Sequence, residues 1–308
     1  MRILVLGAGG IGGYFGGRLV EKGEDVVFLV REKRKQQLEQ SGLVIKSTKG
    51  NYSFKPQLMT KDQHSDPFDV VLLSTKAYHL DEAIKDLKPF VGGTTVIIPL
   101  LNGISHLDQL INEFGKERVA GGLCQIETTL NESGEVIHSS SFDKLVFGEL
   151  NNEMTERIQS VATAFSGTKA DFILSTQILQ DMWHKYLRIT ILSGLTTLMR
   201  APIGPIRESL GGRDFIKALF DEVTQIMRAH HAPIADHVED GQLLAIDELS
   251  YHFKTSMQRD MEKGSLIEGD HIHGHLLTLA EQANLKVPYL RAIYQNLKVY
   301  EQSLLHNN

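Results

Sequence analysis

The sequence predicts a chain of two unlike parts, an α/β part built on a parallel sheet and then an all-helical part. Short apolar runs, typical of strands buried on both faces, alternate with helical patterns up to about Phe172. From Thr176 onward the pattern is helical to the end of the chain. We therefore divide the chain into residues 1–174 and 175–308, and we expect the two parts to pack directly on each other because no Gly/Ser-rich or Pro-rich linker separates them.

The first thirty residues carry the strongest local pattern. A buried strand from Arg2 to Leu6 runs into glycines 7, 9 and 12, spaced G-x-G-x-x-G, and a helix is expected over Tyr14 to Glu21. The first glycine permits the tight turn, the second lets the backbone approach a pyrophosphate, and the third lets helix and strand pack closely. The phosphates would lie over a helix N-terminus, where free N–H groups favour negative charge.

This arrangement indicates a dinucleotide-binding, Rossmann-type doubly wound sheet, whereas glycines alone would fit a merely structural turn. The residues expected to bind the cofactor here are Gly7, Ala8, Gly9, Gly10, Ile11 and Gly12.

The end of the second strand, Asp25 to Val30, indicates which dinucleotide binds. NAD-binding folds usually place an acidic residue there, whereas NADP needs positive charge for its 2′-phosphate. Here Arg31 follows the strand directly, a run of Lys33, Arg34 and Lys35 comes next, and Glu32 is the one acidic neighbour. We predict NADPH/NADP as the cofactor, with Arg31 as the phosphate ligand; the alternative is an ordinary solvated start of a basic helix.

Further strands and a hairpin complete the expected α/β part. The hairpin pairs Leu43 to Ile45 with Tyr52 to Lys55, and the helix before it covers Lys33 to Gln40. The other expected strands are Asp69 to Ser74, Thr94 to Pro99, Val119 to Gln125, Glu135 to Ser139 and Lys144 to Phe147.

Two polar residues follow strands at the edge where parallel strands bind ligands. Lys76 comes just after the third buried strand, and Asn102 comes after the fourth. Both are candidate cofactor or substrate contacts. The alternatives are a surface lysine at a strand exit and a turn-forming Asn-Gly pair.

The helical part carries three further candidates. Lys185 lies on a helix over Thr176 to Met199 that is apolar nearly all round, so its ammonium either extends to water or is held inside for chemistry. Ser256 shares a helix face with Asp260. Glu268 is expected in the first turn of a helix that starts near Leu266, where a carboxylate also suits the helix dipole.

Composition excludes several classes of protein. The 308 residues are 42% apolar and 23% charged with a net charge of −6, which argues against a nucleic-acid partner. No apolar run reaches membrane-spanning length, the chain starts with a strand, and the single cysteine, Cys124, cannot form an internal disulfide. We expect a cytoplasmic protein with no membrane association.

The alternating His271, His273 and His275 have no second ligand cluster, so no metal site is predicted.

Taken together, the motifs resemble those of ketopantoate reductases (2-dehydropantoate 2-reductases) over nearly the whole chain. The similar segments are, in order, GAGGIGGYFGGRL, STKAY, LLNGI, WHK, SMQRD and LIEGDHIHG. The resemblance implies a Rossmann domain followed by an all-helical domain, with NADPH and substrate held between them.

The same resemblance implies roles for individual residues. Lys185 matches the family's general acid, and Glu268 matches a glutamate that serves catalysis and orients the substrate. Ser256 matches the serine that contacts the substrate carboxylate. Asn102 and Lys76 match residues near the nicotinamide and the cofactor. We therefore expect Asn102 to contact both substrate and cofactor, and Glu268 to serve catalysis and contact the cofactor.

The chain departs from the family where asparagines usually follow the catalytic lysine. Ile189 and Ser193 occupy those positions, with Ser193 retained as a candidate substrate contact and Arg188 and Thr190 as neighbouring substitutes. The expected activity is NADPH-dependent reduction of ketopantoate to pantoate, a step of pantothenate and coenzyme A biosynthesis. The alternatives are a reductase of another 2-oxo acid and a non-catalytic NADPH-binding sensor. The expected partner is a small 2-oxo acid, and a homodimer is possible.

Overall fold

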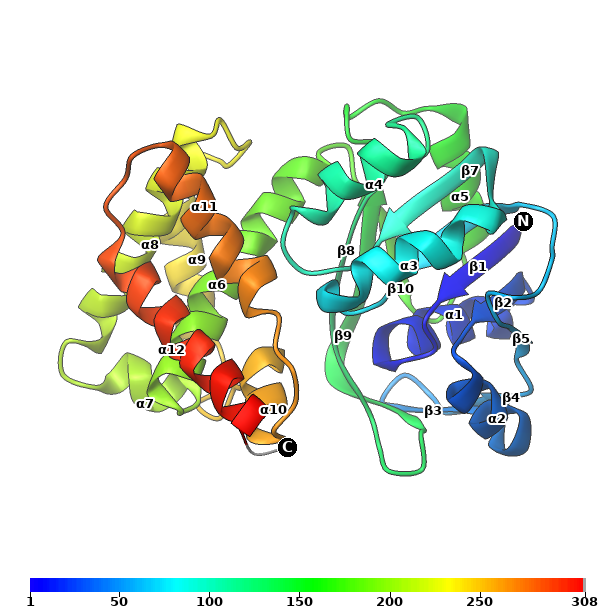
Figure 1. Cartoon of the computed structure of the whole chain (residues 1–308), viewed down its shortest axis with the longest axis horizontal. Helices are drawn as coiled ribbons and strands as arrows, with labels where there is room; N and C mark the ends of the chain where they lie inside the picture. The colour runs from blue at the N-terminus through cyan, green and yellow to red at the C-terminus, as the bar shows by residue number, and fades with distance from the viewer. Residues whose placement is uncertain (307–308) are drawn as a thin grey trace. The chain divides into compact units, whose positions relative to one another are not determined.

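The computed structural model describes residues 1–306, and the chain separates into two compact units (Figure 1). Unit 1 comprises Met1–Leu101 and His106–Ile178, and unit 2 comprises Asn102–Ser105 and the chain from Leu179 onward. The predicted fold class, an α/β part followed by a helical part, is confirmed. The predicted division at 174/175 kept the short segment Asn102–Ser105 in the first part, whereas the structure groups it with the second.

Unit 1 is organised by a parallel five-stranded sheet of order β5-β2-β1-β6-β7. Strands β1, β2 and β6 and the second half of β7 are mostly buried apolar runs, as expected for parallel sheets, whereas the edge strand β5 has no buried residue. Leu6 pairs with Leu29 and Leu73, so the strands end in register and the residues that follow them meet at one edge. The bounds are β1 (Arg2–Leu6), β2 (Asp25–Leu29), β5 (Gln57–Met59), β6 (Phe68–Leu73) and β7 (Val91–Pro99). The short edge strand β5 was not predicted.

A second sheet in unit 1 has the order β10-β9-β3-β4, with β8 paired to β9. The predicted hairpin is confirmed as antiparallel β3 and β4. The prediction of two strands over 135–147 is wrong, because a single β9 runs through Ser140 and Asp143, two polar residues that are buried and hydrogen-bonded. The bounds are β3 (Leu43–Ser47), β4 (Tyr52–Phe54), β8 (Gly121–Leu130), β9 (Val136–Gly148) and β10 (Asp171–Leu174).

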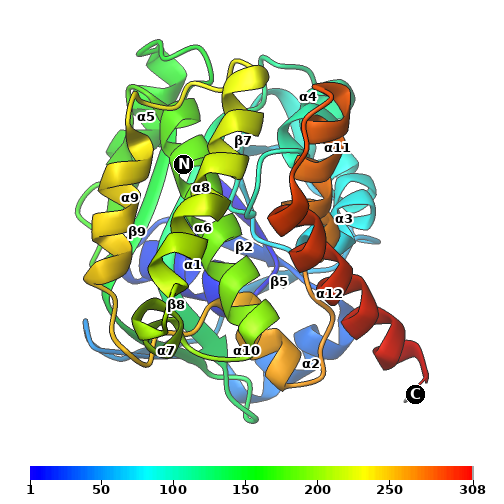
Figure 2. The same cartoon turned by 90° about the vertical axis from the view of Figure 1, so that its left-hand side faces the viewer.

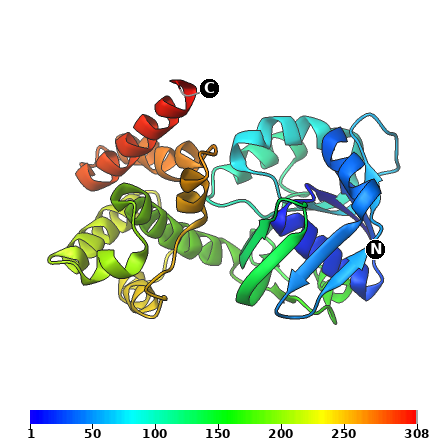
Figure 3. The ribbon, with the colours of Figure 1, turned by 90° about the horizontal axis from the view of Figure 1, so that it is seen from below.

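Helix α1 (Gly10–Lys22) contacts strands of both sheets (Figure 3). Its Phe15 ring packs on Phe172 of β10, and its Tyr14 ring lies 4.8 Å from that of His138 on β9. The helix begins at Gly10, earlier than predicted. The other helical segments of unit 1 are α2 (Glu32–Ser41), η1 (Ala77–His79), α3 (Leu80–Leu87), η2 (Lys88–Phe90), α4 (His106–Phe114) and α5 (Glu156–Phe165).

Unit 2 is built on helices, with α8 packed against α7, α9, α11 and α12 (Figure 2). None of the helices in residues 1–306 combines the length and the apolar character needed to cross a membrane. The bounds are α6 (Ile178–Met199), α7 (Ile203–Glu208), α8 (Gly212–Ala229), α9 (Val238–Asp247), α10 (Ser256–Glu262), the π-helical turn η3 (Asp270–Gly274), α11 (His275–Gln282) and α12 (Pro288–His306).

The predicted helix start near Leu266 is wrong. Residues 265–268 are irregular, and Glu268 precedes the helical backbone instead of lying in its first turn. The physical reason is that Ser265 is held at both ends: its N–H donates to Asp260 and its carbonyl accepts from the Tyr300 hydroxyl at 2.8 Å. The helical backbone therefore begins only at Gly269, directly before the π-helical turn at Asp270.

Candidate active site

The glycine turn in unit 1 has the geometry of a phosphate cradle. Gly7 adopts φ +98°, and a Cβ on Gly12 would lie 2.0 Å from the Gly7 carbonyl oxygen, so both positions require glycine. A Cβ on Gly9 would meet no described atom within 4 Å, so this backbone faces open space. Within residues 1–306, no side chain caps the start of α1 and no acidic residue lies in its first turn. The free N–H groups and the open space fit a dinucleotide pyrophosphate.

Arg31 follows β2 after Val30 and is the residue that directly precedes α2. Its guanidinium makes an exposed ion pair with Glu82 at 2.5 Å and lies 3.4 Å from the His79 ring. Burial, assisted by the Arg31 charge, lowers the pKa of His79. Arg31 is therefore accessible to an anion, but an acidic partner already occupies it.

Arg34 is a residue whose place the sequence did not indicate. Its Nε donates to the Ala8 carbonyl at 3.1 Å, and its other nitrogens bond Gln37 and the Gly134 carbonyl. Burial lowers the pKa of this guanidinium. Arg34 thus links the glycine turn to the β8–β9 connection. Local sequence patterns could not predict this contact, because Arg34 and Ala8 are far apart in the sequence.

Lys76 is half-buried and lies just before η1, two residues past Ser74. The Ser74 N–H donates to Leu6, and its hydroxyl bonds the carbonyls of Leu6 and Gly7. The segment that carries Lys76 is therefore fixed directly to the glycine turn, as the predicted role near the cofactor requires.

In unit 2, Lys185 lies on α6 and is only 9% exposed. A lysine is rarely so buried unless it is paired or used in chemistry. The structure thus buries the residue as a whole, which fits the alternative of a lysine held inside for chemistry.

Asn102 and Glu268, which are far apart in sequence, meet in unit 2. The Asn102 side-chain amide donates to the Glu268 carboxylate across 3.4 Å, a long and weak bond. Glu268 is 7% exposed, so its carboxylate is largely removed from water. The structure thus brings two of the predicted site residues together.

The π-helical turn that follows Glu268 is bonded to α6 at two points. The buried Tyr186 hydroxyl donates to the Ile272 carbonyl at 2.6 Å, and His273 Nε2 lies 3.0 Å from the Thr190 carbonyl. Burial raises the pKa of Tyr186 well above its usual value and lowers that of His273 to about 4. π-Helical turns are frequent at functional sites, and this one connects the segment after Glu268 to the helix of Lys185.

Ser256 and Ser193 differ in solvent exposure and in hydrogen bonding. Ser256 is exposed as the first residue of α10, next to Thr255, which caps that helix. Ser193 is 3% exposed and donates to the Ile189 carbonyl at 2.5 Å. The hydroxyl of Thr190 likewise bonds its own helix, at Tyr186.

The three alternating histidines serve different contacts. His271 Nδ1 lies 3.1 Å from the Ser105 hydroxyl, His273 bonds Thr190, and the His275 ring lies 6.5 Å from that of Tyr186. Among the residues that the structure describes, no group of three His, Cys, Asp or Glu side chains is arranged to hold a metal. Sequence analysis did not assign His271 and Ser105 to the site, since nothing in the pattern shows that these two segments meet.

Comparison with known proteins gives the same assignment over both parts of the chain. Residues 3–152 match the family model described as ketopantoate reductase PanE/ApbA, and residues 177–301 match the model of its C-terminal part. The Bacillus subtilis (strain 168) protein named uncharacterized oxidoreductase YkpB is 48% identical over 98% of this chain and 99% of its own.

Solved structures agree with these matches. A Geobacter metallireducens GS-15 2-dehydropantoate 2-reductase has a TM-score of 0.87 at 26% identity, covering 97% of this chain and 99% of its own. A D-mandelate dehydrogenase solved with NADH and anilino(oxo)acetate has a TM-score of 0.89 at 20% identity, covering 99% of both chains, and it shares the fold. The chain belongs to the ketopantoate reductase family of oxidoreductases.

Proposed function

We propose that this protein is an NADPH-dependent reductase of a 2-oxo acid, with ketopantoate as its first-choice substrate and pantoate as the product, in pantothenate and coenzyme A biosynthesis. The observation that carries the proposal is the part-buried Asn102–Glu268 pair, whose Glu268 precedes a turn bonded to the helix of the buried Lys185. The matched family models and the glycine turn support it.

In this proposal Lys185 is the general acid. Bound NADPH supplies a hydride to the ketone carbon. The Lys185 ammonium donates a proton to the carbonyl oxygen as negative charge develops there, which yields the secondary alcohol and leaves a neutral amine that regains its proton from water. Glu268 and Asn102 orient the reacting groups, and the exposed Ser256 hydroxyl donates to the substrate carboxylate.

Arg31 supports NADPH over NADH. Its ion pair with Glu82 is exposed on both sides, at 61% and 51%, and such pairs contribute at most about 1 kcal/mol. A 2′-phosphate carries more charge than a carboxylate and accepts two bonds from a guanidinium, so exchanging Glu82 for the phosphate is favourable.

A second candidate substrate is a 2-oxo acid other than ketopantoate. The observation that favours it is the pair Ile189 and Ser193 at positions where the family usually has asparagines. Because Ser193 already donates to Ile189, its hydroxyl offers a substrate only lone pairs, whereas an asparagine side chain would also offer N–H donors, which a substrate carbonyl or carboxylate needs. The similar D-mandelate dehydrogenase fold suggests benzoylformate as one acid to test.

The test is the initial rate of NADPH oxidation with ketopantoate, benzoylformate and 2-oxoisovalerate, comparing kcat/KM. We expect turnover that Lys185→Ala reduces at least about 100-fold, as for loss of a general acid, with NADPH affinity unchanged. The exposed Lys263 supplies the control, Lys263→Ala, which should retain full activity. If kcat/KM is higher for another acid than for ketopantoate, that acid becomes the proposed substrate. NADPH binding without turnover of any acid refutes the reductase and favours the sensor.

A further inference from the structure

The His271 side chain joins the π-helical turn after Glu268 to the bend Asn102–Ser105. Its Nδ1 lies 3.1 Å from the Ser105 hydroxyl. A Cβ built on Gly103 would lie 3.0 Å from His271 Cδ2 and 3.1 Å from its Nε2, so the edge of the ring lies on the Gly103 backbone. All of these contacts lie within unit 2.

Gly103 is adapted to this contact in two ways. It adopts φ +77°, a left-handed conformation that favours glycine, and a Cβ there would be in tight contact with the ring. A larger residue at this position would therefore strain the bend and push against the imidazole. The ring fills the inside of that bend.

Burial favours the neutral form of the His271 imidazole. Burial, the largest effect, lowers its pKa, while the Glu268 carboxylate and the Asn102 main chain oppose that shift. A neutral imidazole has one donor and one acceptor nitrogen, so it can bond the Ser105 hydroxyl in a fixed orientation without adding a charge beside Glu268.

We propose that His271 is a positioning residue of the reductase: by bonding Ser105 and packing on Gly103, it holds the Asn102 amide against the Glu268 carboxylate. This inference rests on the proposed function, because Asn102 and Glu268 are the groups through which it acts. The Asn102–Glu268 bond is long, at 3.4 Å, so it cannot fix the bend by itself, and a second support is required.

The chemistry of the substitutions separates this role from simple packing. His271→Phe keeps the ring and removes both nitrogens. His271→Asn places a polar atom near the Nδ1 position and can keep the bond to Ser105, whereas His271→Gln places one near Nε2 and cannot. We expect kcat to fall about 10- to 100-fold in the Phe and Gln variants, as for a small misplacement of a reacting group, and the Asn variant to recover most of it.

The decisive measurement is a double-mutant cycle with Asn102→Ala, using the 2-oxo acid that the wild type reduces fastest. Because His271 acts through Asn102, His271→Phe should cause less than about a twofold further loss of kcat in the Asn102→Ala background. His252→Asn, an exposed histidine of the same unit, is the control and should match the wild type. Equal losses in both backgrounds, or an unchanged kcat and KM in both the Phe and Gln variants, overturn the inference.

A readout independent of turnover separates failure of this inference from failure of the proposed function. The side-chain amide of Asn102, identified by its loss in Asn102→Asp, gives an NMR signal pair that should shift or broaden in His271→Gln and stay near its wild-type position in His271→Asn. If the wild type reduces no 2-oxo acid, the proposed function fails, and this signal still decides whether His271 positions Asn102. An identical signal in all variants overturns the positioning role.

Discussion

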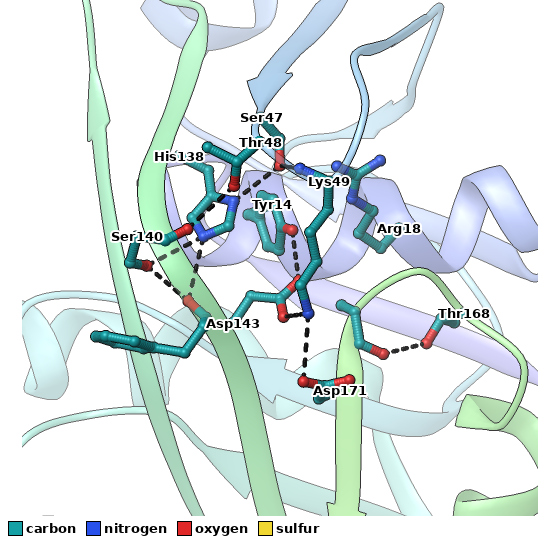
Figure 4. Close-up of polar contacts among 12 residues, drawn as sticks. Tyr14, Arg18, Ser47, Thr48, Lys49, His138, Ser140, Asp143, Thr168 and Asp171 are labelled. Carbon is teal, nitrogen blue, oxygen red and sulfur yellow. Dashed lines mark hydrogen bonds and ion pairs between the residues drawn. The ribbon is translucent and has the colours of Figure 1, made fainter.

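The polar cluster between α1 and the second sheet gives the sharpest test of stability in unit 1. Asp143 is fully buried on β9, where it accepts from the Tyr14 hydroxyl at 2.6 Å and pairs with Lys49, which also reaches Asp171 at 3.3 Å (Figure 4). Burial, assisted by the bond to Asp143, raises the pKa of Tyr14. The pKa of Lys49 is raised as well, since its two acidic partners outweigh the opposing effect of burial. Asp143→Ala removes the acceptor that these groups share.

The cost can be worked out from the partners left behind. The buried Tyr14 hydroxyl would lose the carboxylate that accepts its proton, which costs about 1–3 kcal/mol. Lys49 is 28% exposed and keeps Asp171, so losing the Asp143 pair adds about 1 kcal/mol. The sum of roughly 2–4 kcal/mol corresponds to a fall in Tm of about 4–16 °C for a unit of this size. Asp171→Ala, whose carboxylate is 53% exposed, should cost less than about 1 kcal/mol.

Differential scanning calorimetry is the suitable assay, because the single tryptophan, Trp183, lies on α6 and does not report unit 1. Tyr14→Phe in the Asp143→Ala background should cost about 1–3 kcal/mol less than in the wild type, since the hydroxyl that lost its acceptor is then gone. A loss in Asp143→Ala no larger than in Asp171→Ala, or strict additivity with Tyr14→Phe, would refute the reasoning.

Three further outcomes are expected. Glu82→Gln should lower the NADPH Kd by up to about fivefold and leave the NADH Kd unchanged in fluorescence titrations, because the competitor for Arg31 is removed; an equal change for both cofactors would contradict this. Gly9→Ala should weaken NADPH binding at unchanged Tm, whereas Gly12→Ala should lower Tm, since its Cβ would meet the Gly7 carbonyl oxygen at 2.0 Å; matching effects on Tm would be inconsistent with the geometry. Burial lowers the pKa of His273 from 6.5 to about 4, so the unfolded chain takes up a proton at this residue first as pH falls. About 3 kcal/mol of unfolding free energy that is present above pH 6.5 should therefore be lost as the pH approaches 4. In denaturant titrations, His273→Gln should flatten that dependence, and an unchanged slope would argue against it.

The sequence predicted the fold well where burial on both faces leaves a continuous apolar run. Strands β1, β6 and β7 are such runs, and the glycine turn between β1 and α1 has a local pattern of its own. The prediction failed at β9, where Ser140 to Asp143 were interpreted as a break between two strands. The strand continues because Asp143 finds Tyr14 and Lys49, which lie far away in the sequence.

The candidate site was predictable residue by residue but not as an arrangement. Helical periodicity gives the face of the helix on which Lys185 lies. It does not tell how deeply that face is buried, which only the structure shows. The Asn102–Glu268 contact joins segments 166 residues apart. Arg34 and His271 read as ordinary polar residues, because their partners, Ala8 and Ser105, come from other parts of the chain.

Helix α6 carries two neighbouring rows of side chains with different expected roles. Tyr186, Thr190 and Ser193 lie along one buried row, and their polar atoms bond the π-helical turn or the helix itself. Lys185 and Ile189 lie along the neighbouring row at the i, i+4 spacing. The buried row fixes the helix against the segment after Glu268, and it does so whatever side chain stands at position 189. Having isoleucine instead of asparagine at position 189 can therefore change which substrate binds, by our proposal a 2-oxo acid, without displacing Lys185, the proposed proton donor. For this reason substrate and reaction are tested by different variants.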